Sequence, residues 1–392
     1  MGEVEERLLD ITSDDESEGI QDAKPKYNKS LDSYLMRFKW WIELSMYTFL
    51  SLGGQAGATL LGKVYYDQGG TSKWLVATLQ TAGFPFLIPF LLLPSSKTPN
   101  QNTKITKNNS SNPPPPSLPL LASVYTFLGV LLAAGGVFYS VAIEYLSAST
   151  FSLLLSSQLA FTAILALFIN AQRFTPYILN SVVLLAFSPL LLVIENDNGG
   201  SPEPAAGDGF MLGALFTVAS AASLALLFSL TELAFEKMIG GAGVGSTMSE
   251  TLKMTLWQCV VATAVTAAGL FWSGEWWGLK AEMEGYKQGV VSYFLNVVGT
   301  GVTCQAYYVG SIALTFKVSS LFSNVVIRLG TPVIPFLSVV FLGEEMSGLK
   351  MMALMLSLWG FASYIYQQYL DELKGDVDDD ENQSIQDFNF SA

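Results

Sequence analysis

Residues 118–170 read LPLLASVYTFLGVLLAAGGVFYSVAIEYLSASTFSLLLSSQLAFTAILALFIN, and this stretch decides the fold. It holds two mostly apolar runs, 118–142 and 147–170, and its one charged side chain, Glu144, falls between them. Each run has about the twenty residues that an α-helix needs to cross the apolar part of a bilayer. The stretch therefore predicts two membrane-spanning helices joined by a short turn.

The same pattern recurs along most of the chain. Of the 392 residues, 51% are hydrophobic and only 14% are charged, which is too apolar for an ordinary soluble domain. The predicted helices span residues 40–62, 73–94, 118–142, 147–170, 174–195, 209–235, 252–272, 288–312, 317–342 and 349–369. The sequence thus predicts an all-α membrane protein with ten transmembrane helices.

The two halves of the chain resemble each other weakly. Ser149-Thr150, an apolar helix and Gln158 compare with Ser319-Ser320, an apolar helix and Arg328, at an offset of 170 residues. Five helices per half is an odd number, so the second copy must insert in the opposite orientation, as in many secondary transporters. We therefore predict two inverted repeats of five helices, with chance similarity between apolar helices as the alternative.

The predicted organisation has five parts. They are an acidic cytosolic tail (1–39), a first repeat (40–195) with a flexible cytosolic loop (95–117), an extracellular connector (196–208), a second repeat (209–370) and an acidic cytosolic tail (371–392). The net charge of −13 gathers in the tails and loops, where acidic residues are solvated. This distribution indicates no nucleic-acid partner.

The distribution of basic residues predicts the orientation in the membrane. If the amino terminus is cytosolic, 14 Lys and Arg side chains lie inside and 5 lie outside, and the remaining one, Arg328, falls near the middle of a helix. Because cationic loops stay on the cytosolic side, we expect both termini in the cytosol of a multi-pass protein. The acidic residues 1–15 lack the apolar core of a signal peptide, so the first helix is expected to direct insertion into the lipid bilayer.

The residue content argues against an enzyme. The chain has no histidine, and its two cysteines, Cys259 and Cys304, fall in predicted helices. No nucleotide-binding loop, catalytic acid pair, triad or metal-ligand cluster is visible, so we expect no catalytic residues, no metal and no cofactor.

Neutral amides within the predicted helices are the strongest candidates for binding a substrate. They are Gln55, Gln80, Gln158, Gln258, Asn296, Gln305 and Asn324. An amide offers both a donor and an acceptor, so it can hold the edge of a planar heterocycle, whose faces aromatic rings can cover. The substrate-binding residues predicted on this basis are Gln55, Trp74, Gln80, Gln158, Tyr293, Asn296, Tyr307 and Asn324. The alternative is that each amide only bonds a neighbouring helix.

Three charged residues enter the apolar ranges. Glu43 and Glu232 are candidates for proton coupling, with anchoring at the membrane interface as the alternative for each. Arg328 falls near the middle of the ninth helix and is a buried charge near the predicted cavity, for which pairing with another protein group is the alternative to contact with substrate.

Several blocks of sequence are distinctive. They are residues 65–74 (YYDQGGTSKW), 80–85 (QTAGFP), 149–162 (STFSLLLSSQLAFT), 174–176 (FTP), 319–325 (SSLFSNV) and 358–361 (LWGF). Together these blocks resemble the plant purine permease family, and the resemblance covers all ten predicted helices.

This resemblance implies the drug/metabolite transporter fold and import of purine nucleobases and adenine-type cytokinins, such as adenine and trans-zeatin, coupled to protons. We accordingly expect a secondary active importer in the plasma membrane that works by alternating access. The alternatives are a transporter of another nitrogenous heterocycle, such as an alkaloid or a vitamin-like compound, a transporter of nucleotide sugars, and a membrane receptor or scaffold that transports nothing.

Overall fold

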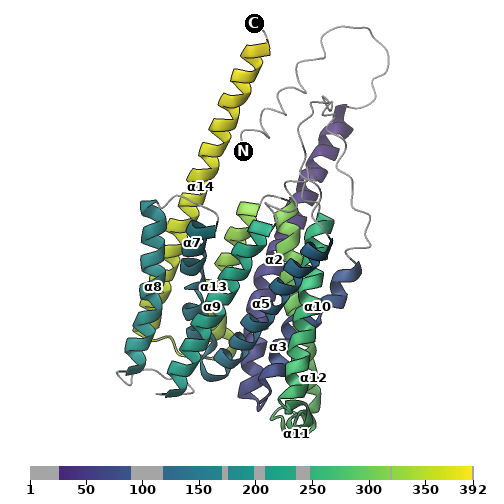
Figure 1. Cartoon of the computed structure of the whole chain (residues 1–392), viewed down its shortest axis with the longest axis vertical. Coiled ribbons are helices and arrows are strands. Elements are labelled where there is room, and N and C mark those ends of the chain that lie inside the picture. Colours follow the sequence, from purple (N-terminus) through teal and green to yellow (C-terminus); the bar gives the residue numbers. More distant parts are fainter. Residues whose placement is uncertain are drawn as a thin grey trace. The chain divides into compact units, whose positions relative to one another are not determined.

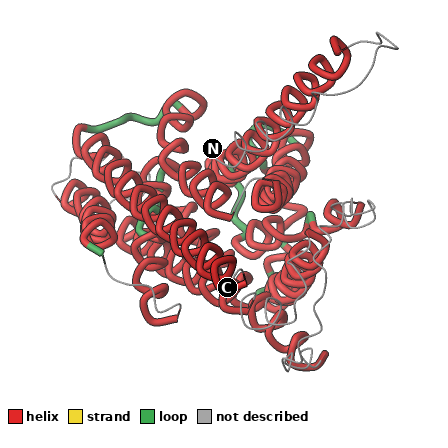
Figure 2. Tube along the Cα trace, turned by 90° about the horizontal axis from the view of Figure 1, so that it is seen from above, coloured by secondary structure: helices red, strands yellow, loops and turns green. Residues whose placement is uncertain are grey.

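The computed structural model of the protein describes residues 26–89, 118–169, 175–197, 208–234, 248–317 and 320–390. All regular structure in these ranges is helical (Figures 1 and 2). The predicted loop 95–117 and residues 198–207 of the predicted connector lie outside the described residues.

The chain forms two units, Met1–Ser45 and Met46–Ala392. The first unit contains the beginning of α2 (Lys26–Asp67), where the rings of Trp40 and Trp41 make an edge-to-face contact with centroids 5.0 Å apart. The second unit contains the rest of α2 and the other helices described below.

The helices agree with the predicted ranges except that the first begins at Lys26 and the last ends at Phe390, so both extend into the predicted tails. After α2 come α3 (Lys73–Ala82), η1 (Phe84–Leu87), α5 (Leu118–Tyr145), α6 (Ala148–Leu155), α7 (Gln158–Ile169), α8 (Pro176–Asp197), α9 (Asp208–Ala234), α10 (Met248–Trp272), η4 (Glu275–Trp277), α11 (Leu279–Gly285), α12 (Val290–Lys317), α13 (Ser320–Leu342) and α14 (Gly348–Phe390). Each predicted range overlaps at least one helix, because the length of an apolar run is set by the bilayer that it must cross.

Six helical segments among the described residues are long and apolar enough to cross a membrane. They are Pro119–Tyr145, Ala148–Leu165, Pro176–Glu195, Asp208–Thr231, Leu252–Trp272 and Gly348–Gln367. The protein is therefore a helical, multi-pass membrane protein.

Two predicted helices are interrupted. The second changes from α3 to the 3₁₀-helix η1 at Gly83, just before Pro85, which has no backbone N–H to continue the α-helical ladder. The fourth divides into α6 and α7, where the Ser156 and Ser157 hydroxyls donate to the carbonyls of Leu153 and Leu154 at 2.5 and 2.8 Å. Such hydroxyl bonds compete with the helical ladder and bend it.

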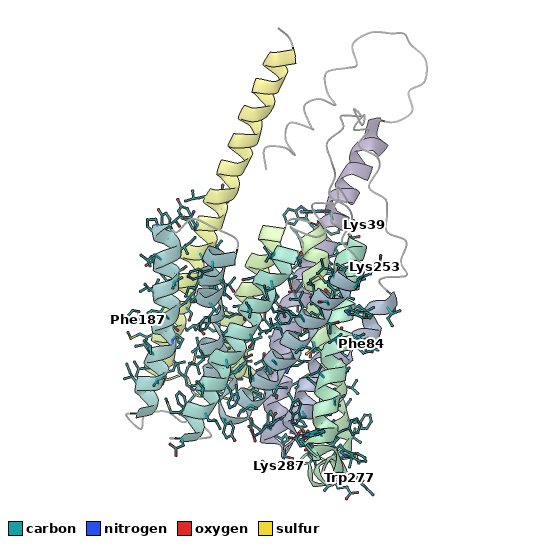
Figure 3. All side chains as sticks on the ribbon, viewed as in Figure 1. Lys39, Phe84, Phe187, Lys253, Trp277 and Lys287 are labelled. Carbon is teal, nitrogen blue, oxygen red and sulfur yellow. The ribbon has the colours of Figure 1, made fainter. Side chains whose placement is uncertain are left out.

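Large apolar side chains cover the outer faces of these helices. Phe187 on α8 and Trp277 on η4 point away from their neighbours (Figure 3), and Leu215 and Trp359 are likewise exposed. Exposed apolar surface of this extent is expected where the solvent is lipid.

Inside the Met46–Ala392 unit, α5 packs along α9 and α10, α8 packs along α14, and α10 also packs along α3. The α2–α12 contact depends on glycine. A Cβ atom on Gly54 would lie 2.5 Å from the Tyr307 nitrogen, and one on Gly310 would lie 2.6 Å from the Ser51 nitrogen. Small residues thus let the two backbones touch, as is common between membrane helices.

Candidate functional site

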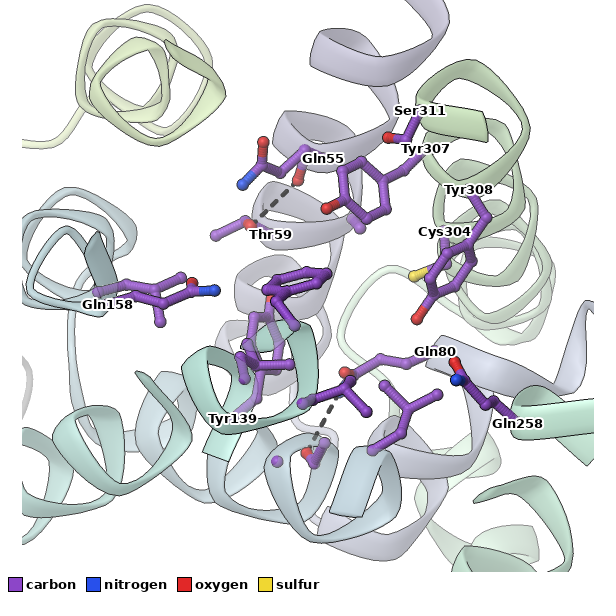
Figure 4. Close-up of a pocket in the computed structure, with 18 of the residues that line it drawn as sticks. Gln55, Thr59, Gln80, Tyr139, Gln158, Gln258, Cys304, Tyr307, Tyr308 and Ser311 are labelled. Carbon is purple, nitrogen blue, oxygen red and sulfur yellow. Dashed lines mark hydrogen bonds between the residues drawn. The ribbon is translucent and has the colours of Figure 1, made fainter. Parts of the chain in front are cut away.

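A cavity of about 340 Å³ lies inside the Met46–Ala392 unit (Figure 4). Its lining comes from both halves of the chain, namely α2, α3, α5, α6 and α7 from the first and α9, α10 and α12 from the second. The volume falls in the range of small-molecule sites.

Four glutamines line this cavity. Gln55, Gln80, Gln158 and Gln258 come from α2, α3, α7 and α10. Figure 4 shows Gln158 and Gln258 reaching in from opposite sides, with Gln80 between the helices that carry them. Among the described lining residues none is Asp, Glu, Lys or Arg. Because an unpaired charge is costly in such surroundings, this lining suits a neutral polar ligand.

Gln80 is held in one orientation. Its Nε2 donates to the Gly136 carbonyl of α5 at 3.3 Å. A backbone carbonyl can only accept, so an amide flip would break this bond. Gly136 has no side chain, and a Cβ there would lie 3.4 Å from the Gln80 Oε1. The bond therefore leaves Oε1 as the acceptor that Gln80 can offer to a ligand.

Two other amides have atoms without a protein partner. The Gln258 side chain is only 8% exposed, and its Nε2 makes no hydrogen bond within the described structure. The Oε1 of Gln55 is also buried and without a partner, and it faces α13, where a Cβ on Gly330 would lie 2.0 Å from it. A buried amide atom without a partner costs about 1–3 kcal/mol, which a ligand can recover.

Aromatic side chains supply flat surfaces around these amides. The rings of Tyr307 and Tyr308 on α12 lie 5.4 Å apart, and Tyr139 on α5 packs edge-to-face on Phe151 at 4.9 Å. All three tyrosines line the cavity (Figure 4). Rings of this kind can cover the face of a heterocycle.

Of the substrate-binding residues predicted from the sequence, Gln55, Gln80, Gln158 and Tyr307 are brought together at the cavity. Trp74 is not a lining residue, because its ring lies against Gly269 of α10, where a Cβ would come within 2.2 Å of it.

Tyr293 and Asn296 also lie outside the lining. Tyr293 packs with Tyr65 and Tyr286 in a separate aromatic cluster. The Nδ2 of Asn296 donates to the Leu61 carbonyl at 3.0 Å, which ties α12 to α2.

The remaining predicted residues are not placed at the cavity. The side chains of Glu232, Asn324 and Arg328 are outside the described part of the chain. Glu43 belongs to the Met1–Ser45 unit, whereas the lining comes from the other unit.

Several lining residues did not enter the predicted site. Gln258 stood among the amides but was not selected, and Tyr139, Thr59 and Cys304 were not proposed to bind substrate. A signal for Tyr139 was present, because Gly135 and Gly136 lie one helical turn before it and leave space on that face of α5. Within the described residues, no group of three or more His, Cys, Asp or Glu is arranged to hold a metal ion.

A second polar region, which we call the carboxylate cap, lies at one end of the same helices. It consists of Glu275 and Glu282 together with Tyr65, Thr71 and Ser72. Glu282 accepts from the Tyr65 hydroxyl at 2.5 Å and from the backbone N–H and hydroxyl of Thr71 at 3.1 and 2.9 Å.

Glu275 completes the cap at the start of α3. One of its oxygens accepts from the Ser72 hydroxyl at 2.6 Å and from the Trp74 N–H at 3.1 Å. The cap therefore joins the segment 65–74 to the segment between α10 and α12. It lies at the carboxyl end of α10 and the amino end of α12, whereas lining residues Thr255 and Ser311 lie toward the opposite ends of these helices.

Glu344 makes a similar contact elsewhere on the molecule. Its two oxygens accept from the backbone N–H groups of Ala148 and Ser149 at 2.7 and 3.0 Å. A carboxylate at the first turn of α6 satisfies N–H groups that have no partner within the helix. It ties the α13–α14 connection to α6.

Comparison with known proteins places this architecture among permeases. A family described as purine nucleobase transmembrane transport matches residues 42–374. In Arabidopsis thaliana, Probable purine permease 11 is 45% identical over 341 residues, which cover 87% of this chain and 86% of that protein. Purine permease 21 is 41% identical over 363 residues (92% and 88%), and Probable purine permease 10 is 41% identical over 355 residues (90% and 88%).

Proposed function

The chain belongs to the purine nucleobase transmembrane transport family, and from this premise we propose that its cavity binds the heterocycle during transport. The family consists of permeases, which move a substrate and do not transform it. The observation that carries the proposal is the neutral lining of amides and tyrosines contributed by both halves of the chain.

The chemistry of the lining suits a neutral purine. Adenine-type bases carry donors and acceptors around a flat, uncharged ring, and amides can bond such an edge in pairs. Tyrosine rings can cover the apolar faces of such a base. The same features accommodate adenine-type cytokinins, which we include in the proposed substrate class.

We further propose that ten helices form two inverted repeats, 40–195 and 209–370, which alternate access to the cavity. Support comes from the packing. Counterparts lie five predicted helices apart, so α5 corresponds to α12, α9 to α2 and α10 to α3. The contact between α5 and α9 therefore corresponds to that between α12 and α2, and the contact between α5 and α10 corresponds to that between α12 and α3. All four contacts occur in the structure.

Counterpart helices also meet each other directly. Ser188 on α8 and Ser357 on α14 are 169 residues apart in sequence, and their hydroxyl oxygens lie 2.8 Å apart. On the same helices Asn180 bonds Ser363, so the chain runs in opposite directions along the two. Antiparallel contact between counterparts is what an inverted repeat requires.

The proposed transport cycle uses the carboxylate cap as the outer gate. With both termini cytosolic, the segments that form the cap face outward, as the distribution of basic residues predicts. The conformation described would then be closed toward the outside, with lining residues Thr255 and Ser311 toward the inside. We propose that transport in this orientation is import through the plasma membrane.

Proton coupling is the least constrained part of the proposal. Glu43 and Glu232 remain our candidates for the proton acceptor, because intramembrane carboxylates are the usual carriers when histidine is absent. Uptake that responds to a pH gradient in the native protein but not in Glu43→Gln or Glu232→Gln would assign the role.

The test of the binding site is uptake of radiolabelled adenine into proteoliposomes. Ala58→Trp places an indole in the cavity, so we expect uptake to fall by about tenfold or more. Ala362→Trp adds the same group at an exposed position on α14 and serves as the matched control. Normal uptake by a folded Ala58→Trp protein would exclude the cavity as the transport site.

A further inference from the structure

Gln258 is the most buried amide that lines the cavity and still has an atom without a partner. Its side chain is 92% buried, and its Nε2 donates to no described protein group. Figure 4 shows the amide directed into the cavity. Because native structures rarely leave buried donors unpaired, we expect a ligand acceptor to pair with this atom.

Gln80 offers the complementary group. One N–H of its Nε2 bonds the Gly136 carbonyl, which fixes the orientation of the amide and leaves the acceptor Oε1 open to a ligand. The two glutamines lie on α3 and α10, whose contact is fixed by a hydrogen bond of 2.9 Å between the hydroxyls of Thr263 and Thr81. One donor and one acceptor are thus presented to the same space from two helices in contact.

We propose that this pair selects neutral 6-aminopurines among the possible substrates. Gln80 Oε1 accepts a hydrogen bond from the exocyclic amine, and Gln258 Nε2 donates to one of the two unprotonated ring nitrogens that flank this amine, N1 or N7. The inference rests on the proposed function, since it requires the purine to occupy the cavity. It adds which residues bind the purine and which group of the purine each one contacts.

The assignment has a chemical consequence for substituted purines. An amine with one alkyl group keeps one N–H for Gln80, whereas an amine with two alkyl groups has none. In a dry site, the Gln80 Oε1 facing such a dialkylated amine would have no hydrogen-bond donor. A site built to bond a substrate N–H rejects analogues that lack it for this reason. Monoalkylated adenines are therefore accepted and dialkylated ones are disfavoured.

A matched control is available on α12. Gln305 is 3% exposed, both its amide atoms lack partners, and it is not a lining residue. Replacing it by Met makes the same chemical change in a buried helix without touching the cavity. Any effect shared by Gln258→Met and Gln305→Met therefore reflects the loss of a buried amide in general.

The test is competition with radiolabelled adenine uptake into proteoliposomes by N6-methyladenine, N6,N6-dimethyladenine, 1-deazaadenine and 7-deazaadenine. For the native protein we expect N6,N6-dimethyladenine to compete about tenfold more weakly than N6-methyladenine, the effect of one lost hydrogen bond. One of the two deaza compounds should be weaker than adenine by a similar factor.

The variants assign each preference to a residue. Gln80→Met should bring the dimethyl to monomethyl ratio close to one, and Gln258→Met should remove the penalty of the sensitive deaza compound. Gln305→Met should keep both native ratios. If the native protein does not distinguish the two methylated adenines, or if folded Gln80→Met and Gln258→Met proteins keep the native ratios, the inference is wrong while adenine transport through the cavity stands. Unimpaired uptake by Ala58→Trp would instead overturn the proposed function itself.

Discussion

The carboxylate cap and the cavity are two polar regions on the same helices, and they differ in how many of their buried polar atoms have hydrogen-bond partners. In the cap, both oxygens of Glu282 are used, by Tyr65 and by Thr71. In the cavity, the Nε2 of Gln258 has no described partner. Satisfied polar groups hold segments together, whereas open ones beside a cavity are available to a ligand.

An open atom alone does not mark a binding site. The Oδ1 of Asn296 and both amide atoms of Gln305 also lack partners, yet neither residue lines the cavity. The criterion is therefore the combination of an unpaired buried atom with a cavity large enough for a ligand. The predictions below test this division between structural and binding roles.

The largest effect is expected in the cap. Glu282→Leu removes the acceptor of three hydrogen bonds at a side chain that is 9% exposed, so unfolding should become easier by about 2–4 kcal/mol. Thermal unfolding in detergent measures this. Glu284→Leu, at an exposed position on the same short helix, should change stability little. Equal stability of the two variants would remove the structural role of the cap.

An intermediate effect is expected in the cavity, and it concerns substrate affinity and not stability. Gln55→Met removes an oxygen that has no protein partner, so stability should change by less than about 1 kcal/mol. The KM for adenine uptake should rise about tenfold, because the cavity loses one of its lining amides. Gln288→Met, at an exposed position just before α12, is the control. A destabilised Gln55→Met protein with native KM would place Gln55 with the structural residues.

The smallest effect is expected at Asn296. Asn296→Ala removes the bond to the Leu61 carbonyl and should lower stability by about 1 kcal/mol while KM stays native. Asn180→Ala, which removes an exposed bond to Ser363, should cost less. A raised KM for Asn296→Ala, measured by initial uptake rates, would show that the division drawn between the two regions is wrong at this residue.

The helices could be predicted from the sequence because bilayer thickness dictates the length of each apolar run. The predicted range 118–142 and α5 (Leu118–Tyr145) share their first residue. The break at Ser156 and Ser157 was not predicted, because it depends on which way two hydroxyls turn. The cap was not predicted either, since nothing local in residues 65–74 indicates a partner more than 200 positions later.

The amides show why the site could be predicted only in part. Composition identifies which helices carry amides but not which face each one occupies. On α12, Thr300, Cys304 and Ser311 follow the helical period along the cavity, whereas Gln305 lies one residue past Cys304 and points elsewhere. Asn296 keeps the period but lies one turn beyond the cavity, where the Leu61 carbonyl is its partner.

The central claim is that the purine binds in this cavity, and photoaffinity labelling tests it most directly. Native protein in proteoliposomes would be irradiated with 2-azidoadenine, with and without excess adenine, and the labelled peptides mapped by mass spectrometry. We predict adenine-protected label on peptides of α3, α10 or α12 that carry lining residues such as Gln80, Gln258 and Tyr307. Adenine-protected label confined to α8 or α14 would contradict the account.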